Sequence, residues 1–221
     1  MIKEYIKTLE PYVLEMFKDD YTGHDIKHLE RTMKTALYIC NKEKKGDKLI
    51  VALAAYLHDI HRIIQAKEKR FVSPKETLPV ARELLSHVDL TEEQIEKICY
   101  CIEYHEEYNW NRKNVKDINA LIVQDADNID ALGAIGLART FNYGGSYKKR
   151  MFDEDKSLEL PEDFVEEVAD NYATINHFFY KELRLEKYMN TKTATKIAKK
   201  RTKFMRKFIK NFIEEWKANY Y

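Results

Sequence analysis

The chain has 221 residues, enough for one domain, or one domain with a helical extension, and for a real hydrophobic core. Its 6 glycines and 4 prolines against 34% charged residues disfavour an all-β sandwich, which needs many turn residues, and are typical of long helices with charged outer faces. The net charge of +1 gives no overall attraction to nucleic acid or to a membrane surface.

Helical periodicity begins at the N-terminus of the chain. Apolar residues recur at helical spacing from Ile2 to Phe17 and again from Ile26 to Cys40. After Asp47, a predicted cap, the segment 49–57 (LIVALAAYL) is apolar all round, which predicts a central buried helix. That helix runs directly into the pair His58-Asp59.

The rest of the chain also follows a helical pattern. We expect residues 61–72 to form a loop or lid, and Thr91 with Gln94 to form a capping box. The remaining predicted helices are one from about Leu78, then 91–107, 117–140, 162–185 and 191–217. We find no alternating strand pattern, so an all-α fold is predicted. Its main part is 1–150 (core 21–145), and 151–221 forms C-terminal helices packed on the same domain.

The cysteines and the N-terminus bear on cellular location. Cys40, Cys99 and Cys101 form no CxxC pair and are expected to be buried thiols in a reducing compartment. The N-terminus lacks the hydrophobic run of a signal peptide, and no stretch is expected to reach the roughly 20 apolar residues that span a bilayer. We therefore expect a soluble, cytoplasmic protein without a membrane partner.

Several histidines stand where a polar group needs a partner. His24 and His28 are four residues apart and are expected on one helical face, with Arg31 three residues further on. The pair His58-Asp59 ends the most buried predicted helix, where an imidazole and a carboxylate cost solvation free energy unless they are paired or bind a metal. A single histidine is more often structural than functional, so the prediction depends on the ordered series of residues.

An acidic group completes that series. Asp125, Asp127 and Asp130 lie in an otherwise apolar segment and repel one another unless a cation or basic groups compensate their charge. Two imidazoles and two carboxylates from three helices suit one divalent ion of Mn, Mg, Fe, Co, Ni or Zn. Such an ion lowers the pKa of bound water and polarises a phosphoryl group. The candidate ligands are His28, His58, Asp59 and Asp127.

Four segments resemble motifs of the HD-domain superfamily of metal-dependent phosphohydrolases, and in particular its small stand-alone branch. They are GHDIKHLERT, AAYLHDIHR, CIEYHEEYN and IVQDADNIDALGAIGLART, between about Tyr21 and Gly145. The resemblance implies an HD-domain helical bundle with a C-terminal helical extension and metal ligation by the same four residues. It also implies hydrolysis of phosphate ester or phosphoanhydride bonds in a small phosphorylated substrate, with a nucleotide the first candidate.

The sequence also departs from some relatives. HD nucleotidases carry an acidic residue three positions after the HD aspartate, where this chain has Arg62, so their general acid/base is not carried over. The arginine common after the DAD motif is Asn128 here. Two-metal relatives carry an adjacent pair of histidines that His61, His87 and His105 do not reproduce. A single metal is therefore favoured, and a second one stays open.

Three residues are candidates for catalysis. Asp59 combines this role with metal ligation. His105 continues the apolar face of its helix and is predicted to point inward, either as a core histidine or as a donor to a phosphate oxygen or leaving group. Asp130, one turn beyond Asp127, either orients water or His24, or is a carboxylate that solvates its helix.

Cationic side chains and imidazoles are the candidates for substrate binding, because guanidinium groups pair with phosphate. Arg201 lies on the apolar face of the last helix, where a charge needs a partner. His177 and Lys181 either close over the substrate or face solvent. The full set is His24, Arg31, Arg62, Arg139, His177, Lys181 and Arg201.

Two rival functions stay open. Because Arg62 replaces an expected acid, a non-catalytic metal or nucleotide sensor with the same fold is the alternative. The Lys/Arg run at 187–210 suggests RNA binding, but its regular apolar stripe indicates the solvated face of an amphipathic helix, so nucleic acid is not the expected partner. The sequence does not define the oligomeric state, and a homodimer stays open.

Overall fold

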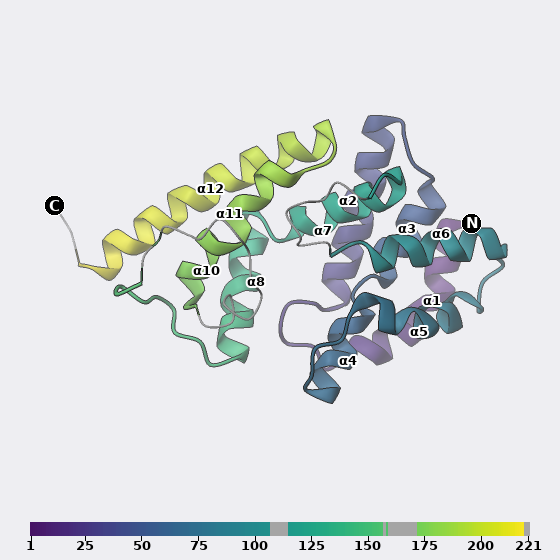
Figure 1. Cartoon of the computed structure of the whole chain (residues 1–221), viewed down its shortest axis with the longest axis horizontal. Helices are drawn as coiled ribbons and strands as arrows, with labels where there is room; N and C mark the ends of the chain where they lie inside the picture. Colours follow the sequence, from purple (N-terminus) through teal and green to yellow (C-terminus); the bar gives the residue numbers. More distant parts are fainter. Residues whose placement is uncertain (107–114, 157, 159–171, 219–221) are drawn as a thin grey trace. The chain divides into compact units, whose positions relative to one another are not determined.

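The computed structural model describes residues 1–106, 115–156, 158 and 172–218, and all regular structure in these ranges is helical (Figure 1). The predicted all-α fold is confirmed. The chain forms two compact units, Met1–Asp127 and Asn128–Tyr221. The domain boundary expected near residue 150 stays a prediction, because a compact unit need not fold independently.

The first unit is built around one apolar helix. Its elements are α1 (Ile2–Phe17), α2 (Ile26–Glu43), α3 (Lys48–Leu57), α4 (Ile60–Glu68), the 3₁₀ turn η1 (Pro74–Thr77), α5 (Leu78–Leu85), α6 (Glu92–Glu103) and most of α7 (Ile118–Asp130). Every residue of α3 from Leu49 to Leu57 is buried, and the helix packs against α1, α2 and α6. The Asp47 carboxylate caps α3 by accepting hydrogen bonds from the amides of Leu49 (2.8 Å) and Ile50 (3.2 Å). The predicted central helix is confirmed.

Side-chain hydrogen bonds fix the start of α6 and hold α7 against the turn that follows α6. Thr91 and Gln94 form the predicted capping box at the start of α6. The α6 helix ends at Glu103, and Tyr104, His105 and Glu106 continue as a turn. The Gln124 amide in α7 donates to the Tyr104 carbonyl at 2.6 Å. This bond attaches α7 to the turn that carries His105.

The segment expected to be a loop or lid is helical instead. Residues 60–68 form α4, which buries Ile60, His61 and Ile63 against the core. Lys69, in the left-handed conformation with φ 53°, ends the helix and donates its amide to the Gln65 carbonyl. The prediction was wrong because two apolar residues about one turn apart, Ile60 and Ile63, are enough to pack one face of the helix.

One stretch, Lys48–Glu68 (21 residues, mean hydropathy 1.2), is apolar and long enough to cross a membrane by length and composition alone. The expectation that no stretch qualifies is wrong by this criterion. In the structure 78% of the apolar window is buried, and a core helix of a soluble protein passes the same test, so the stretch is only a weak indication of a membrane span. The cytoplasmic location stays a prediction.

The predicted helix at 117–140 is two helices. The α7 helix ends at Asp130, and α8 (Gly133–Ser146) follows after a break. Gly133 lies at this break with φ +80°, a backbone conformation that glycine adopts more readily than other residues. A Cβ on Gly136 would lie 2.2 Å from the Ala131 carbonyl oxygen, so the break between α7 and α8 leaves no room for a side chain at this position.

The second unit contains α8, α10 (Thr174–Tyr180), α11 (Glu182–Leu185), the turn η2 (Glu186–Tyr188) and α12 (Lys192–Trp216). The helix predicted at 191–217 is confirmed as α12, whose apolar face packs against α8 and α11. The helix predicted at 162–185 is represented by α10 and α11, and residues 162–171 lie outside the described residues. The three cysteines are buried free thiols, as predicted.

Candidate metal centre

Four side chains of the first unit converge on one point. His28 Nε2 lies 3.1 Å from His58 Nε2, 3.1 Å from Asp59 Oδ2 and 3.4 Å from Asp127 Oδ1. His58 Nε2 lies 3.5 Å from each of the same two carboxylate oxygens. Three helices supply them, since His28 is in α2, the pair His58-Asp59 follows α3 and Asp127 is in α7. The structure therefore brings the four predicted ligands together.

Local structure orients the two imidazoles. The amide of His28 donates to the carboxylate of the α2 cap Asp25 at 2.8 Å, which fixes the first turn of the helix. His58 Nδ1 lies 2.8 Å from the Ala55 carbonyl oxygen. A carbonyl only accepts, so Nδ1 carries the proton and Nε2 of neutral His58 presents its lone pair to the centre.

These distances fit a divalent ion. Two ligands that lie about 2.1 Å from one ion, at about 90–109° to each other, are separated by roughly 3.0–3.4 Å. Asp59 Oδ2 is buried and accepts no hydrogen bond from the described residues, although His28 Nε2 is 3.1 Å away. A cation between these atoms would satisfy both lone pairs. His28, His58, Asp59 and Asp127 are therefore the residues that would hold it.

The electrostatics agree with this assignment. Burial alone would raise the pKa of Asp127, but the imidazoles of His28 and His58 hold it well below its usual value. Burial likewise opposes ionisation of Asp59, and His58 with the neighbouring histidines nevertheless lowers the pKa of that carboxyl. The two carboxylates in turn raise the pKa of His58 against the effect of burial. Without an ion, protons on imidazole compensate the carboxylates, and a divalent ion would replace these protons.

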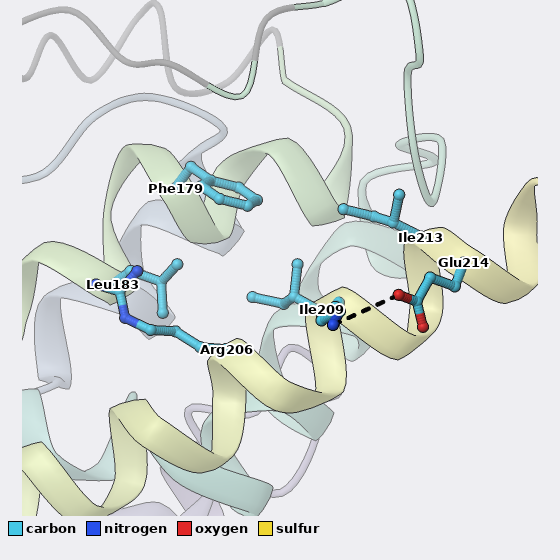
Figure 2. A pocket seen from close by; sticks show the side chains of 7 residues that line it. Phe179, Leu183, Arg206, Ile209, Ile213 and Glu214 are labelled. Carbon is cyan, nitrogen blue, oxygen red and sulfur yellow. Dashed lines mark ion pairs between the residues drawn. The ribbon is translucent and has the colours of Figure 1, made fainter.

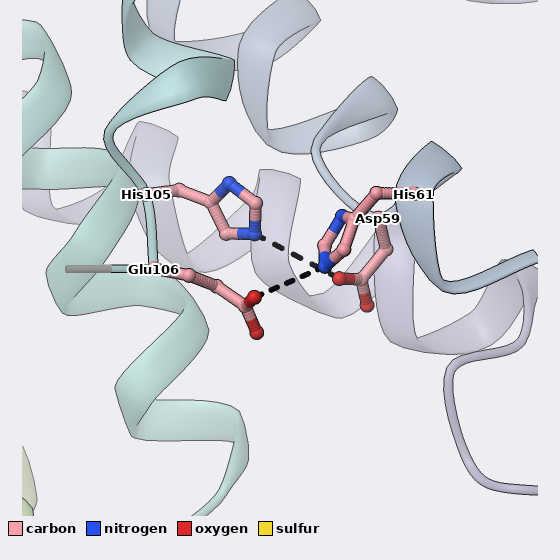
Figure 3. A group of neighbouring side chains, drawn as sticks. All are labelled: Asp59, His61, His105 and Glu106. Carbon is pink, nitrogen blue, oxygen red and sulfur yellow. Dashed lines mark hydrogen bonds and ion pairs between the residues drawn. The ribbon is translucent and has the colours of Figure 1, made fainter. Parts of the chain in front are cut away.

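A second group of side chains lies beside the first, around Asp59 (Figure 3). His105 Nε2 is 3.8 Å from Asp59 Oδ1, and His61 Nε2 is 3.0 Å from Glu106 Oε2. The guanidinium of Arg62 forms an ion pair with the other oxygen, Glu106 Oε1. Against burial, Arg62 and His61 hold the pKa of Glu106 well below its usual value.

Sequence reasoning missed Glu106. The signal was present, because this residue directly follows His105 in the segment CIEYHEEYN. Its partners, however, come from α4, which was expected to be a loop or lid. Arg62, predicted as a phosphate-binding residue, is placed against this carboxylate.

Two further candidates lie in the first unit. His24 precedes α2, whose cap is Asp25, so it is not on the face of that helix as predicted. Its ring nevertheless lies 5.8 Å from the ring of His28, and its Nδ1 is 2.8 Å from the Thr22 hydroxyl. Arg31 is half-buried in α2.

The other candidates lie in the second unit. Arg139 pairs with Asp130 at 3.0 Å, and His177 pairs with Glu182 at 3.0 Å. Lys181 follows the last residue of α10. Arg201 donates to the carbonyls of Ile129 (2.5 Å) and Leu132 (3.4 Å). The roles proposed for these residues in substrate binding stay predictions.

An apolar groove of about 390 Å³ also lies in the second unit, between α10, α11 and α12 (Figure 2). Phe179, Leu183, Ile209 and Ile213 line it, and an ion pair between Lys210 and Glu214 (3.7 Å) lies at its side. This lining suits an apolar group better than a phosphate.

Comparison with known proteins gives a consistent result. The family model "HD domain" matches residues 25–132. The Bacillus subtilis protein YpgQ is 30% identical over 193 residues, which cover 86% of this chain and 82% of YpgQ. The crystal structure of YpgQ in complex with ADP has a TM-score of 0.71 at 27% identity and covers 97% of this chain and 95% of that one.

Two other solved structures are similar over nearly the whole chain. A protein from Lactobacillus plantarum has a TM-score of 0.81 at 27% identity, with 98% of each chain covered. An HD-superfamily hydrolase from Bacillus thuringiensis has a TM-score of 0.71 at 31% identity, with 99% of this chain and 100% of that chain covered. The chain belongs to the HD-domain family, as its matched segment, its similarity to YpgQ and its structural neighbours show.

Proposed function

We propose that this protein is a metal-dependent phosphohydrolase that cleaves a phosphate ester or phosphoanhydride bond of a nucleotide. The observation that supports this proposal is the convergence of His28, His58, Asp59 and Asp127, with nitrogen–nitrogen and nitrogen–oxygen distances of 3.1 to 3.5 Å. These buried donors form a mixed nitrogen and oxygen site that suits a single divalent ion.

In the reaction, the oxygen of water bonds to phosphorus, the bond from phosphorus to the leaving oxygen breaks, and the leaving oxygen gains a proton. A divalent ion bound here would supply Lewis acidity and lower the pKa of water. The chain contributes two carboxylates, Asp59 and Asp127, that stay ionised at neutral pH because their pKa values are lowered. It also contributes oriented imidazoles, since His58 and His105 are each held by a backbone carbonyl.

The relatives support a nucleotide as the substrate. YpgQ was crystallised with ADP, and the similar Bacillus thuringiensis protein is described as an HD-superfamily hydrolase. These similarities favour a nucleotide substrate for this chain. Arg62 stands where some relatives have an acid. Glu106 nevertheless supplies a further carboxylate beside the site, 3.0 Å from His61.

A single-turnover assay tests the proposal. Protein loaded with Mn²⁺ is mixed with a panel of nucleoside mono-, di- and triphosphates and with simple phosphomonoesters, and phosphate and pyrophosphate release are measured. We expect release with at least one nucleotide and its loss in Asp127→Asn. The exposed Asp19→Asn variant is the matched control and should behave like the wild type. Release by Asp127→Asn at the wild-type rate, or none by the wild type, would overturn the proposal.

One observation favours a second candidate function, a nucleotide sensor without turnover. Both oxygens of Glu106 are engaged, one by Arg62 and one by His61, which reduces the capacity of this carboxylate to accept a proton. A sensor would bind the intact nucleotide tightly and release no phosphate in the same assay.

A further inference from the structure

We propose that Asp20 and Thr22 are positioning residues that fix the ring of His24, so that its Nε2 accepts a hydrogen bond from an O–H group beside the metal centre. This inference rests on the proposed function for its catalytic meaning, but the state of the ring is tested without any reaction. The three residues lie in the segment that joins α1 to α2. Each of them is half-buried, so solvent reaches part of this segment.

The Asp20 carboxylate organises the segment. Its Oδ2 accepts hydrogen bonds from three consecutive backbone amides, those of Thr22 (3.1 Å), Gly23 (3.1 Å) and His24 (2.9 Å). Gly23 has φ 95°, a conformation that glycine reaches readily and that allows the three amides to converge on one oxygen. The other oxygen, Oδ1, accepts from the Thr22 hydroxyl at 2.7 Å. One carboxylate therefore fixes both the backbone before His24 and the Thr22 side chain.

The direction of these hydrogen bonds sets the tautomer of His24. Thr22 Oγ1 lies 2.8 Å from His24 Nδ1. A hydroxyl has one proton to donate, and the Thr22 hydroxyl donates it to Asp20, because an ionised carboxylate only accepts. The Thr22 oxygen therefore accepts from His24, and Nδ1 carries the proton. In the neutral ring, Nε2 is then the atom with the lone pair.

His24 lies beside the metal centre. Its ring is 5.8 Å from the ring of His28, in an edge-to-face contact. His28 Nε2 is one of the atoms that converge on the proposed ion, 3.1 Å from His58 Nε2. A group bound by His24 would therefore lie close to the place where water attacks phosphorus.

The lone pair on Nε2 decides which group His24 binds. A nucleotide phosphate presents acceptor oxygens, which a second acceptor does not bind. The fitting partner is an O–H donor, and a nucleotide hydrolase has two of them, the attacking water and a hydroxyl of the sugar. His24, one of the predicted substrate-binding residues, is thereby assigned to an O–H group rather than to phosphate.

Asp20→Asn should reverse the chain of hydrogen bonds without removing it. The amide oxygen of asparagine takes the place of Oδ2, because three N–H donors face this position. Its NH₂ group then faces the Thr22 hydroxyl and donates to it. The hydroxyl in turn donates to His24 Nδ1, and the ring proton moves to Nε2.

Nuclear magnetic resonance of the full chain tests the tautomer. The ¹⁵N chemical shifts of an imidazole distinguish a protonated from an unprotonated ring nitrogen, and the spectrum of His24→Gln identifies the His24 signals. The protein is loaded with diamagnetic Mg²⁺ in a mildly alkaline buffer, which favours neutral imidazole. We expect the proton on Nδ1 in the wild type and in the control Asp19→Asn, an exposed neighbour, and on Nε2 in Asp20→Asn. The opposite tautomer in the wild type, or no reversal in Asp20→Asn, would overturn the proposal.

Steady-state kinetics identify the O–H donor. The nucleotide that is hydrolysed fastest is compared with its 2′,3′-dideoxy form. If the donor is the attacking water, Asp20→Asn lowers kcat for both substrates by roughly 10²-fold, the cost of a misplaced reacting group, with little change in KM. If the donor is a sugar hydroxyl, KM rises for the parent nucleotide alone. A reversed tautomer with wild-type kcat and KM would contradict the proposal.

Two changes at Thr22 give an independent reading, also if Asp20→Asn does not fold. Thr22→Val removes the hydroxyl at nearly constant shape, so His24 Nδ1 loses its partner and the same kinetic constant should change in the same direction. Thr22→Ser keeps a hydroxyl and should restore the wild-type constants. Wild-type kinetics in Thr22→Val, or no rescue by Thr22→Ser, would contradict the positioning role.

The outcomes separate this inference from the proposed function. A wild type with the proton on Nδ1, a reversed tautomer in Asp20→Asn and no hydrolysis of any nucleotide would support the positioning of the ring and contradict the function. Hydrolysis by a wild type whose His24 carries the proton on Nε2 would do the reverse.

Discussion

His58 and His105 are each positioned by the backbone of their own turn. His58 and His105 donate Nδ1–H to carbonyls at 2.8 and 2.6 Å, so the Nε2 atom points inward before any ion arrives. Such outer hydrogen bonds fix the tautomer and raise the basicity of a ligating imidazole. The orientation of these imidazole rings therefore favours cation binding.

Loss of one carboxylate ligand should strongly weaken metal binding. We expect Asp127→Asn to lower Mn²⁺ affinity by more than the about 10–100-fold that the loss of an outer hydrogen bond costs. The amide carries no charge and binds hard cations less well. Isothermal titration calorimetry measures the change, and Asp19→Asn on the exposed surface should leave the affinity unchanged. Equal affinities of Asp127→Asn and wild type would contradict the ligand assignment.

Glu106 should stabilise the metal-free fold in a pH-dependent way. Its pKa in the folded protein is well below the ordinary value of 4.5, so its contribution is present above about pH 4.5 and is lost as pH falls through the folded value. Glu106→Ala leaves Arg62 in a nearly buried position without this carboxylate, which should cost about 3 kcal/mol at pH 7. Urea unfolding in the presence of a chelator measures the free energy of unfolding of both proteins. The difference in this free energy between Glu106→Ala and the wild type should become smaller as the buffer is made more acidic.

A half-buried glutamate that pairs with an exposed lysine provides the control for that experiment. Glu103 pairs with Lys75 at 3.3 Å, and the Lys75 side chain is 76% exposed. Glu103→Ala should therefore change the free energy of unfolding by less than about 1 kcal/mol. A loss in Glu106→Ala no larger than this would contradict the structural role of the Glu106 pair.

His58 and Asp59 could be predicted because they end a strongly apolar helix, and His28 and Asp127 because they stand in an ordered series with that pair. His58 and Asp59 follow nine consecutive buried residues, and Asp127 lies between the buried apolar residues Ala126 and Ile129 in α7. Glu106 could not be predicted in this way. Its environment depends on Arg62 and His61 from another helix, and that pairing between distant segments leaves no periodic signal.

At the scale of elements, caps place the ligands. Asp25 caps α2 next to His28, and Asp47 caps α3 one helix length away from His58. Both carboxylates accept hydrogen bonds from backbone amides in the first turn of the helix that they cap. The two caps thus differ chiefly in their distance along the helix from a ligand.

We expect Asp25→Ala and Asp47→Ala each to lower the free energy of unfolding by about 1 kcal/mol, the usual cost of losing a cap. Only Asp25→Ala should also weaken Mn²⁺ binding, because it loosens the turn that carries His28. Thermal unfolding and calorimetric titration of the same two proteins provide the comparison. An equal loss of metal affinity in both variants would show that the effect comes from general destabilisation.

Arg201 joins α12 to the turn between α7 and α8. It donates to two backbone carbonyls of that turn, and an added Cβ on Gly133 would meet its side chain at 3.0 Å. Arg201→Ala should therefore lower the free energy of unfolding by about 1.5–3 kcal/mol. The exposed Lys203→Ala variant should change it by less than about 0.5 kcal/mol. Unchanged stability with weaker nucleotide binding would instead favour the predicted role of Arg201 in substrate binding.

Element boundaries show the limits of sequence reading. The α3 and α12 helices were predicted nearly to the residue, because one is apolar all round and the other has a long regular stripe. The α4 helix was missed, since its few apolar residues pack only against a core that the sequence does not reveal. The break before Gly133 was also missed, because the apolar pattern continues across it.

At the scale of the whole molecule, the four proposed metal ligands lie within the unit Met1–Asp127. Four of the predicted substrate-binding residues, Arg139, His177, Lys181 and Arg201, lie within Asn128–Tyr221. The all-α fold and the membership in the HD-domain family follow from sequence motifs that cover the first unit most strongly. The substrate does not follow from those motifs.

The central claim is that water attacks phosphorus at this centre. The direct measurement is hydrolysis of ATP and ADP by Mn²⁺-loaded protein in water enriched in ¹⁸O, followed by mass spectrometry of the products. The account predicts one ¹⁸O atom in the phosphate, pyrophosphate or nucleotide product for each bond cleaved, and no product with Asp127→Asn. Intact nucleotides after many hours with the wild type, or products without ¹⁸O, would contradict it.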